Sequence, residues 1–269
     1  MANFDVVTWW DRRSYHWQPA PKPAAQVPPT NTPHNPYLNV PGARQLSESV
    51  PDFLARLPPA TTDWCPGLDW IRISNPHLPP PSSDSDHTRL LEGGAERLAL
   101  FASFEQMASV VGRSPTQVRA DISRERGKAV KDLKALAAAC SVVCGKWMLF
   151  PEPGDVNDVW ARVATATADN TLGIAAKVEP RVASEKARLI CVYTRDFRDK
   201  EDVGRVLDRM RELELVRPSG RQIYYKSGWS PFDFVWPFSL GNDAYPVLQM
   251  RGQSLGFMEG TSGKSRHQR

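Results

Sequence analysis

Two β-strand patterns joined by a short loop constrain the fold of this 269-residue chain more than any other feature. TLGIAAKV (171–178) and RLICVYT (188–194) are rich in β-branched and small apolar residues, which predicts two buried strands. The loop between them, 179–187, has about nine residues, whereas a parallel crossover connection needs roughly a dozen or more. The two segments therefore form an antiparallel hairpin, and we expect a largely antiparallel sheet.

The remaining hydrophobic patterns extend this hairpin into an α+β domain. SFEQ, beginning at Ser103, and SPTQ, beginning at Ser114, are both typical of helix N-termini, as are Asp155 and Asp199. The predicted strands are 70–74, 146–150 and 221–226 in addition to the hairpin, and the predicted helices are 49–57, 103–112, 114–140, 156–168 and 199–213. We expect a curved sheet with three helices, each with one apolar stripe, packed on one face and the other face open to a ligand.

Proline is distributed unevenly, and this distribution predicts the domain boundaries. Eleven of the 24 prolines lie before residue 60, where they disfavour helices and central strands. We expect a Pro-rich, mostly disordered segment (1–59), one folded domain (60–228) and a divergent, poorly ordered tail (229–269). Two interpretations of Trp9, Trp10 and Trp17 are open: they pack back onto the domain, or they form a docking motif for a protein partner. We also hypothesise that the tail derives from intron read-through or a wrong gene model.

Several classes of protein are disfavoured by the composition. The longest apolar run, 135–143, is too short to cross a bilayer, which needs about 20 residues, and the N-terminus lacks the pattern of a secretory signal. Cys65, Cys140, Cys144 and Cys191 and the five histidines show no metal-ligand spacing. No nucleophile, zinc-protease or phosphate-loop motif is present. We expect a cytoplasmic protein, with a nuclear location also open, that is not an enzyme and uses no cofactor or metal.

The remaining candidate chemistry is aromatic and basic. A tryptophan face can stack on a base and a basic loop can hold phosphates, a combination typical of RNA and nucleotide binding. The net charge of +4 is compatible with this function without establishing it. The bland alternative is that Trp70 belongs to the core and the basic loop is merely solvated. The candidate ligand-binding residues are Trp64, Trp70, Lys177, Arg181, Lys186 and Arg188.

Several motifs together resemble one protein family. WIRISNP (70–76), CGKWMLF (144–150), NDVW (157–160), LGIAAKV (172–178), the segment 189–213 and QIYYK (222–226) are similar to the basophilic-leukaemia-expressed protein family, a family of unknown function common in fungi. The resemblance covers about 60–227. It implies a fold similar to that of translation initiation factor 4E, the messenger-RNA cap-binding protein, in which a curved antiparallel sheet is backed by helices.

The resemblance carries the cap-binding site over only in part. Trp147 and Trp160 match structural tryptophans of the initiation factor. Its second cap-stacking tryptophan, followed by a glutamate, should fall within 133–143, where this chain has neither residue. Lys186 or Arg188 matches its phosphate-gripping positions. The resemblance implies a module that binds RNA or a cap-like nucleotide, or alternatively a protein-interaction scaffold that kept the fold and lost cap binding.

Overall fold

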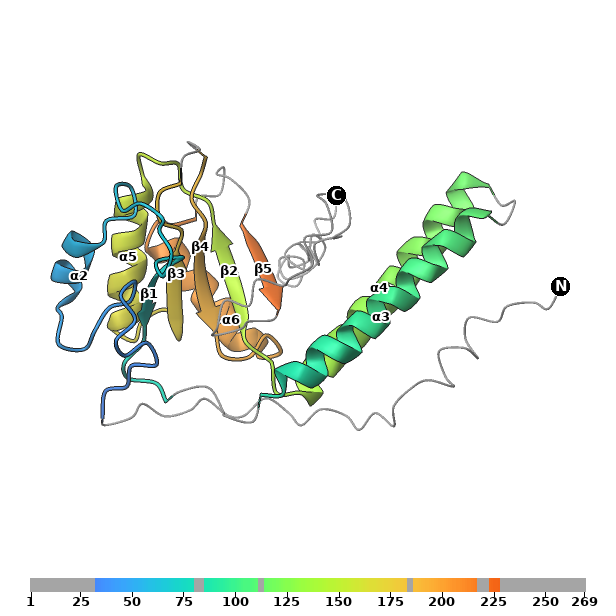
Figure 1. Cartoon of the computed structure of the whole chain (residues 1–269), viewed down its shortest axis with the longest axis horizontal. Coiled ribbons are helices and arrows are strands. Elements are labelled where there is room, and N and C mark those ends of the chain that lie inside the picture. Colours follow the sequence, from blue (N-terminus) through green and yellow to red (C-terminus); the bar gives the residue numbers. More distant parts are fainter. Residues whose placement is uncertain (1–31, 80–84, 111–113, 183–185, 217–222, 228–269) are drawn as a thin grey trace, which may run out of the picture.

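The computed structural model describes residues 32–79, 85–110, 114–182, 186–216 and 223–227, and they form an α+β structure built on one five-stranded sheet (Figure 1). The strands are β1 (Ile71–Ser74), β2 (Gly145–Leu149), β3 (Ala175–Val178), β4 (Ile190–Thr194) and β5 (Tyr224–Ser227). Their order across the sheet is β1-β3-β4-β2-β5, and every neighbouring pair is antiparallel. The order of elements expected from the sequence is confirmed.

The predicted hairpin is confirmed as the centre of this sheet. β3 pairs with β4 in antiparallel register, with Ala176 opposite Val192 and Val178 opposite Ile190. β3 is shorter than its sequence pattern. The chain before it still bonds to β4, because the amide of Ile174 donates to the carbonyl of Tyr193.

Helices cover the first face of the sheet, which carries the main core. Helix α5 (Val156–Ala168) packs on β1 and β3, helix α6 (Lys200–Glu212) packs on β4, and the short helix α2 (Val50–Arg56) packs on α5. Trp160 of α5 is fully buried and makes an edge-on contact with Phe53 of α2. Trp147 of β2 donates from its indole nitrogen to the carbonyl of Val203 on α6. Trp147 and Trp160 are therefore both core residues.

The second face of the sheet carries a smaller core of its own. Two rows of side chains cross this face from β1 to β5, one made of Ser74, Ala175, Tyr193, Lys146 and Lys226 and the other of Arg72, Lys177, Cys191, Met148 and Tyr224. Cys191 and Tyr193 at the centre are almost fully buried. The expectation of an open hollow is therefore wrong at the centre of this face, and its half-exposed positions lie towards the sheet edges.

Helices α3 (His87–Val110) and α4 (Pro115–Ala139) form a long antiparallel pair, here called the helical arm, that extends away from the sheet (Figure 1). The arm differs from the prediction in two ways. α3 begins after Asp86, whose side chain accepts from the amide of Arg89, whereas Ser103 lies inside the helix and bonds back to Ala99. The capping box at Ser114 is confirmed.

The apolar stripe of α4 packs against α3, where the prediction placed it on the sheet. The approach is close at Gly93 of α3, where a Cβ atom would lie 2.9 Å from a methyl group of Leu136, and a Cβ atom on Gly94 would make an ordinary contact with Leu133. The spacing of apolar residues identifies a buried stripe but not the surface that buries it. None of the helices in the described part of the chain is both long and apolar enough for a membrane span.

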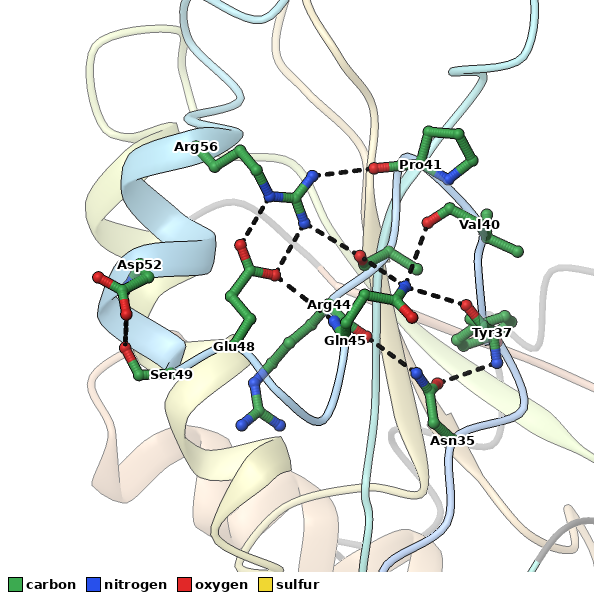
Figure 2. A network of polar contacts seen from close by, with 11 residues as sticks. Asn35, Tyr37, Val40, Pro41, Arg44, Gln45, Glu48, Ser49, Asp52 and Arg56 are labelled. Atoms are coloured by element: carbon green, nitrogen blue, oxygen red, sulfur yellow. Dashed lines mark hydrogen bonds and ion pairs between the residues drawn. The ribbon is translucent and has the colours of Figure 1, made fainter.

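Residues 32–59 are folded onto the domain, so the folded part begins before the expected boundary at residue 60. The amide of Arg72 donates to the carbonyl of Gly42 and the amide of Arg44 donates to the carbonyl of Arg72, so this segment covers the outer edge of β1. Figure 2 shows the polar network that holds the segment in shape, centred on Gln45, Glu48 and Arg56. Trp9, Trp10, Trp17 and the tail 229–269 lie outside the described residues.

Candidate functional site

The most exposed part of the predicted site is a pairing between the segment before β1 and the segment after β3. The amide of Arg181 donates to the carbonyl of Thr62 and the amide of Trp64 donates to the carbonyl of Arg181, at 2.7 and 2.9 Å. Two hydrogen bonds of 2.7 and 2.9 Å join the guanidinium of Arg181 to both carboxylate oxygens of Asp63. This ladder brings together residues more than 100 positions apart in the chain.

Trp64 is held in place while its ring stays in contact with solvent. Its indole nitrogen donates to the carboxylate of Asp69 at 3.1 Å, and its side chain is among the exposed large apolar groups, at 51%. The guanidinium of Arg181 lowers the pKa of Asp63 through the hydrogen bonds and charge they share. An oriented aromatic ring and an exposed arginine in one ladder are groups suited to a base and a phosphate. We call Asp63, Trp64 and Arg181 the Trp64–Arg181 cluster.

Trp70 and Lys177 form a second contact, on the second face of the sheet. The ammonium of Lys177 lies 3.8 Å from the centroid of the Trp70 ring, a close cation–π contact. Lys177 is buried and Trp70 is half-buried. Lys177 therefore stabilises the position of Trp70 and is not itself available at the surface. Trp70 is partly in the core, and part of its side chain stays accessible.

The two basic residues nearest to β4 have different surroundings. Lys186 is exposed on the loop that leads into β4. Arg188 is buried, with 3% of its surface exposed, and its amide donates to the carbonyl of Pro151. The structure thus places Trp64, Arg181 and Lys186 at the surface, Trp70 at the margin, and Lys177 and Arg188 in the interior.

Sequence reasoning overlooked the acids that position the cluster. Asp63 binds Arg181 and Asp69 binds Trp64, and each of these acids directly precedes a tryptophan in the segment TTDWCPGLDW. The repeated Asp-Trp pair was a usable signal, since short acidic side chains commonly fix neighbouring loop groups by hydrogen bonds. The described residues contain no cluster of metal-ligating side chains. Cys144 is buried, and burial raises the pKa of its thiol to about 12.

Comparison with known proteins identifies the family of this chain. A family model described as basophilic leukemia-expressed protein Bles03 matches residues 1–231. The chain belongs to the Bles03 family. The match includes every helix and strand of the Bles03-type domain described above, together with the Pro-rich N-terminal segment, and it ends just after β5. The family therefore covers more of the N-terminus than the motifs between 60 and 227 indicated.

Proposed function

We propose that this Bles03-family chain is a non-enzymatic binding protein that holds RNA or a cap-like nucleotide at the Trp64–Arg181 cluster. The observation that supports the proposal is one exposed ladder in which Asp69 fixes the indole of Trp64 and Asp63 fixes the guanidinium of Arg181. Stacking of a base on an aromatic ring contributes about 1–3 kcal/mol. Lys186, exposed on the segment between β3 and β4, adds a second positive charge for phosphate.

The antiparallel sheet with helices on its first face also supports a likeness to translation initiation factor 4E, and we propose that likeness as the architectural reason for a ligand site at this edge. The site must differ from that of the initiation factor. Residues 133–143, where the second stacking tryptophan is expected, here form the end of α4 and its connection to β2. A single exposed indole therefore stacks one side of a base, which favours modest affinity and tolerance of sequence.

The first experiment measures retention on a methylguanosine-triphosphate resin and binding of short single-stranded RNA at several salt concentrations. We expect measurable binding that weakens as salt rises, because phosphate contacts release counterions. Trp64→Ala and the double variant Arg181→Gln/Lys186→Gln should each weaken binding about tenfold or more. Lys200→Gln is the matched control, since Lys200 is exposed at the start of α6 on the helix-covered side.

A second variant separates an organised site from a merely basic loop. Asp63→Asn adds one positive charge to the net charge but removes the ion pair that orients Arg181. If Arg181 must be oriented, this variant binds RNA more weakly than the wild-type chain despite its extra charge. If Asp63→Asn binds more tightly, nonspecific attraction explains the binding and the proposed site is wrong.

One observation favours the alternative function, a protein-interaction scaffold. Among the described elements, the arm packs chiefly on itself and stands away from the sheet (Figure 1), and Met107 on α3 is 43% exposed. A scaffold of this kind would bind a protein through the arm or the Pro-rich N-terminus and would not bind nucleotide. Deleting residues 1–31, and separately replacing 87–139 by a short linker, would remove protein partners in a pull-down if this alternative is correct.

A further inference from the structure

Two lysines face each other across neighbouring strands on the second face of the sheet. Lys146 of β2 is directly opposite Lys226 of β5, so their side chains leave the same face. On its other side Lys146 is opposite Tyr193 of β4, and its ammonium lies 5.9 Å from the centroid of that ring. Both lysines are half-buried.

This arrangement is unfavourable for the protein alone. Like charges directly opposite each other destabilise an antiparallel pair, and removing an ammonium from water adds a further cost. Burial, and then the charge of Lys146, lower the pKa of Lys226. The contact of Lys146 with Tyr193 offsets this cost only in part, because a cation–π contact at such a distance is weak.

Three arginines of α6 provide a contrast to this pair. Arg205, Arg209 and Arg211 of α6 each have an acid three residues away with which they form an ion pair. Among the ion pairs formed by described residues, none involves Lys146 or Lys226. Two lysines opposite each other on one face, without an ion pair to a described carboxylate, offer a site for an anion, and an anion bound by both would reduce their repulsion.

We propose that Lys146 and Lys226 form a phosphate-binding site on the second face of the sheet. This site holds a phosphate of the ligand that stacks at the Trp64–Arg181 cluster. This inference rests on the proposed function and adds a second anchor to it. Lys177, which contacts Trp70, is on β3, and Lys146 is on β2, at the other side of β4. Their partners on β4, Cys191 and Tyr193, are two residues apart along that strand. Strand spacings place their Cα atoms about 12 Å apart. The shared chemistry is phosphate, supplied by the phosphate chain of a nucleotide or by an RNA backbone.

The experiment compares Lys146→Gln and Lys226→Gln with the wild-type chain, using inorganic tripolyphosphate as the probe and thermal unfolding as the readout. We expect tripolyphosphate to raise the Tm of the wild-type chain and each substitution to abolish most of that rise. Without the anion, each variant should unfold at the same temperature as the wild-type chain or a higher one, because the repulsion is gone. Lys200→Gln should keep the full rise.

Guanosine triphosphate and short RNA form the other two arms. Each substitution should weaken binding about tenfold, and for RNA the salt slope should fall by about 0.7 for the lost phosphate. An effect on both ligands identifies a nucleotide phosphate, whereas an effect on RNA alone identifies the RNA backbone. Lys146→Arg should restore binding, because it keeps the positive charge.

The outcomes separate the two claims. If the wild-type chain binds RNA or nucleotide and the two glutamine variants bind equally well, the lysine site is wrong and the proposed function stands. If the wild-type chain binds neither RNA nor nucleotide, the proposed function is wrong. If the wild-type chain shows no rise in Tm with tripolyphosphate, or if the variants keep that rise, the lysine site is overturned in either case.

Discussion

Replacing Gly42 by alanine should detach the segment that covers the edge of β1. A Cβ atom on Gly42 would lie 2.4 Å from the carbonyl oxygen of Trp70, about 1 Å closer than an ordinary contact. That oxygen belongs to the backbone and cannot rotate away. The segment must therefore move, and the movement breaks or lengthens the bonds of 2.8 and 3.0 Å that Arg72 makes with Gly42 and Arg44.

The expected loss follows from the contacts that depend on this position. Two backbone hydrogen bonds contribute about 1 kcal/mol each, and partial exposure of Ala43, which is fully buried, costs roughly another 1 kcal/mol. The lower entropy of the unfolded alanine chain returns about 0.4–1 kcal/mol. We therefore expect Gly42→Ala to reduce the free energy of unfolding by about 2–3 kcal/mol.

Urea unfolding followed by tryptophan fluorescence measures this loss as a lower midpoint at an unchanged slope. Gly154→Ala is the matched control, because a Cβ atom at Gly154 meets nothing within 4 Å, and its midpoint should stay close to that of the wild-type chain. If Gly42→Ala loses less than about 0.5 kcal/mol, the segment 42–44 does not depend on close approach to β1. The reasoning that joins residues 32–59 to the domain would then be refuted.

Three further predictions test other parts of the structure. The hydrogen bond from Arg56 lowers the pKa of Glu48 below its ordinary 4.5. The stabilising contribution of Glu48 is therefore present above that value and is lost as the pH falls through the folded pKa. Glu48→Gln should lower the free energy of unfolding by about 1 kcal/mol at neutral pH and should flatten the acid limb of stability measured by urea unfolding. Gly127→Ala, in a part of α4 with open space around it, should raise the helical circular dichroism and stabilise the arm by about 0.5–1 kcal/mol. A thiol reagent should modify one cysteine of the native chain rapidly, and Cys65→Ser should abolish this, because Cys65 is exposed and the other three are buried.

The sheet could be predicted from the sequence because its evidence is local. A short loop between two strand patterns leaves only the antiparallel solution for β3 and β4, and the capping residues at Ser114 and Asp199 mark helix starts through bonds to the nearest amides. The arm could not be predicted in the same way. Its two apolar stripes match each other as well as they match a sheet, and only the packing of α3 on α4 in the structure, closest at Gly93, shows which pairing the chain adopts.

The candidate site shows the same limit at the level of single residues. Arg181 and Arg188 look equivalent in the sequence, since both are arginines of one basic loop. Their surroundings separate them: Arg181 lies three residues after the end of β3 and reaches Asp63 at the surface, whereas Arg188 lies two residues before the central strand β4 and is buried, with its amide donating to the carbonyl of Pro151. The contacts that each residue makes in the folded chain therefore decide which basic residues are available to a ligand, and a hairpin pattern alone does not contain those contacts.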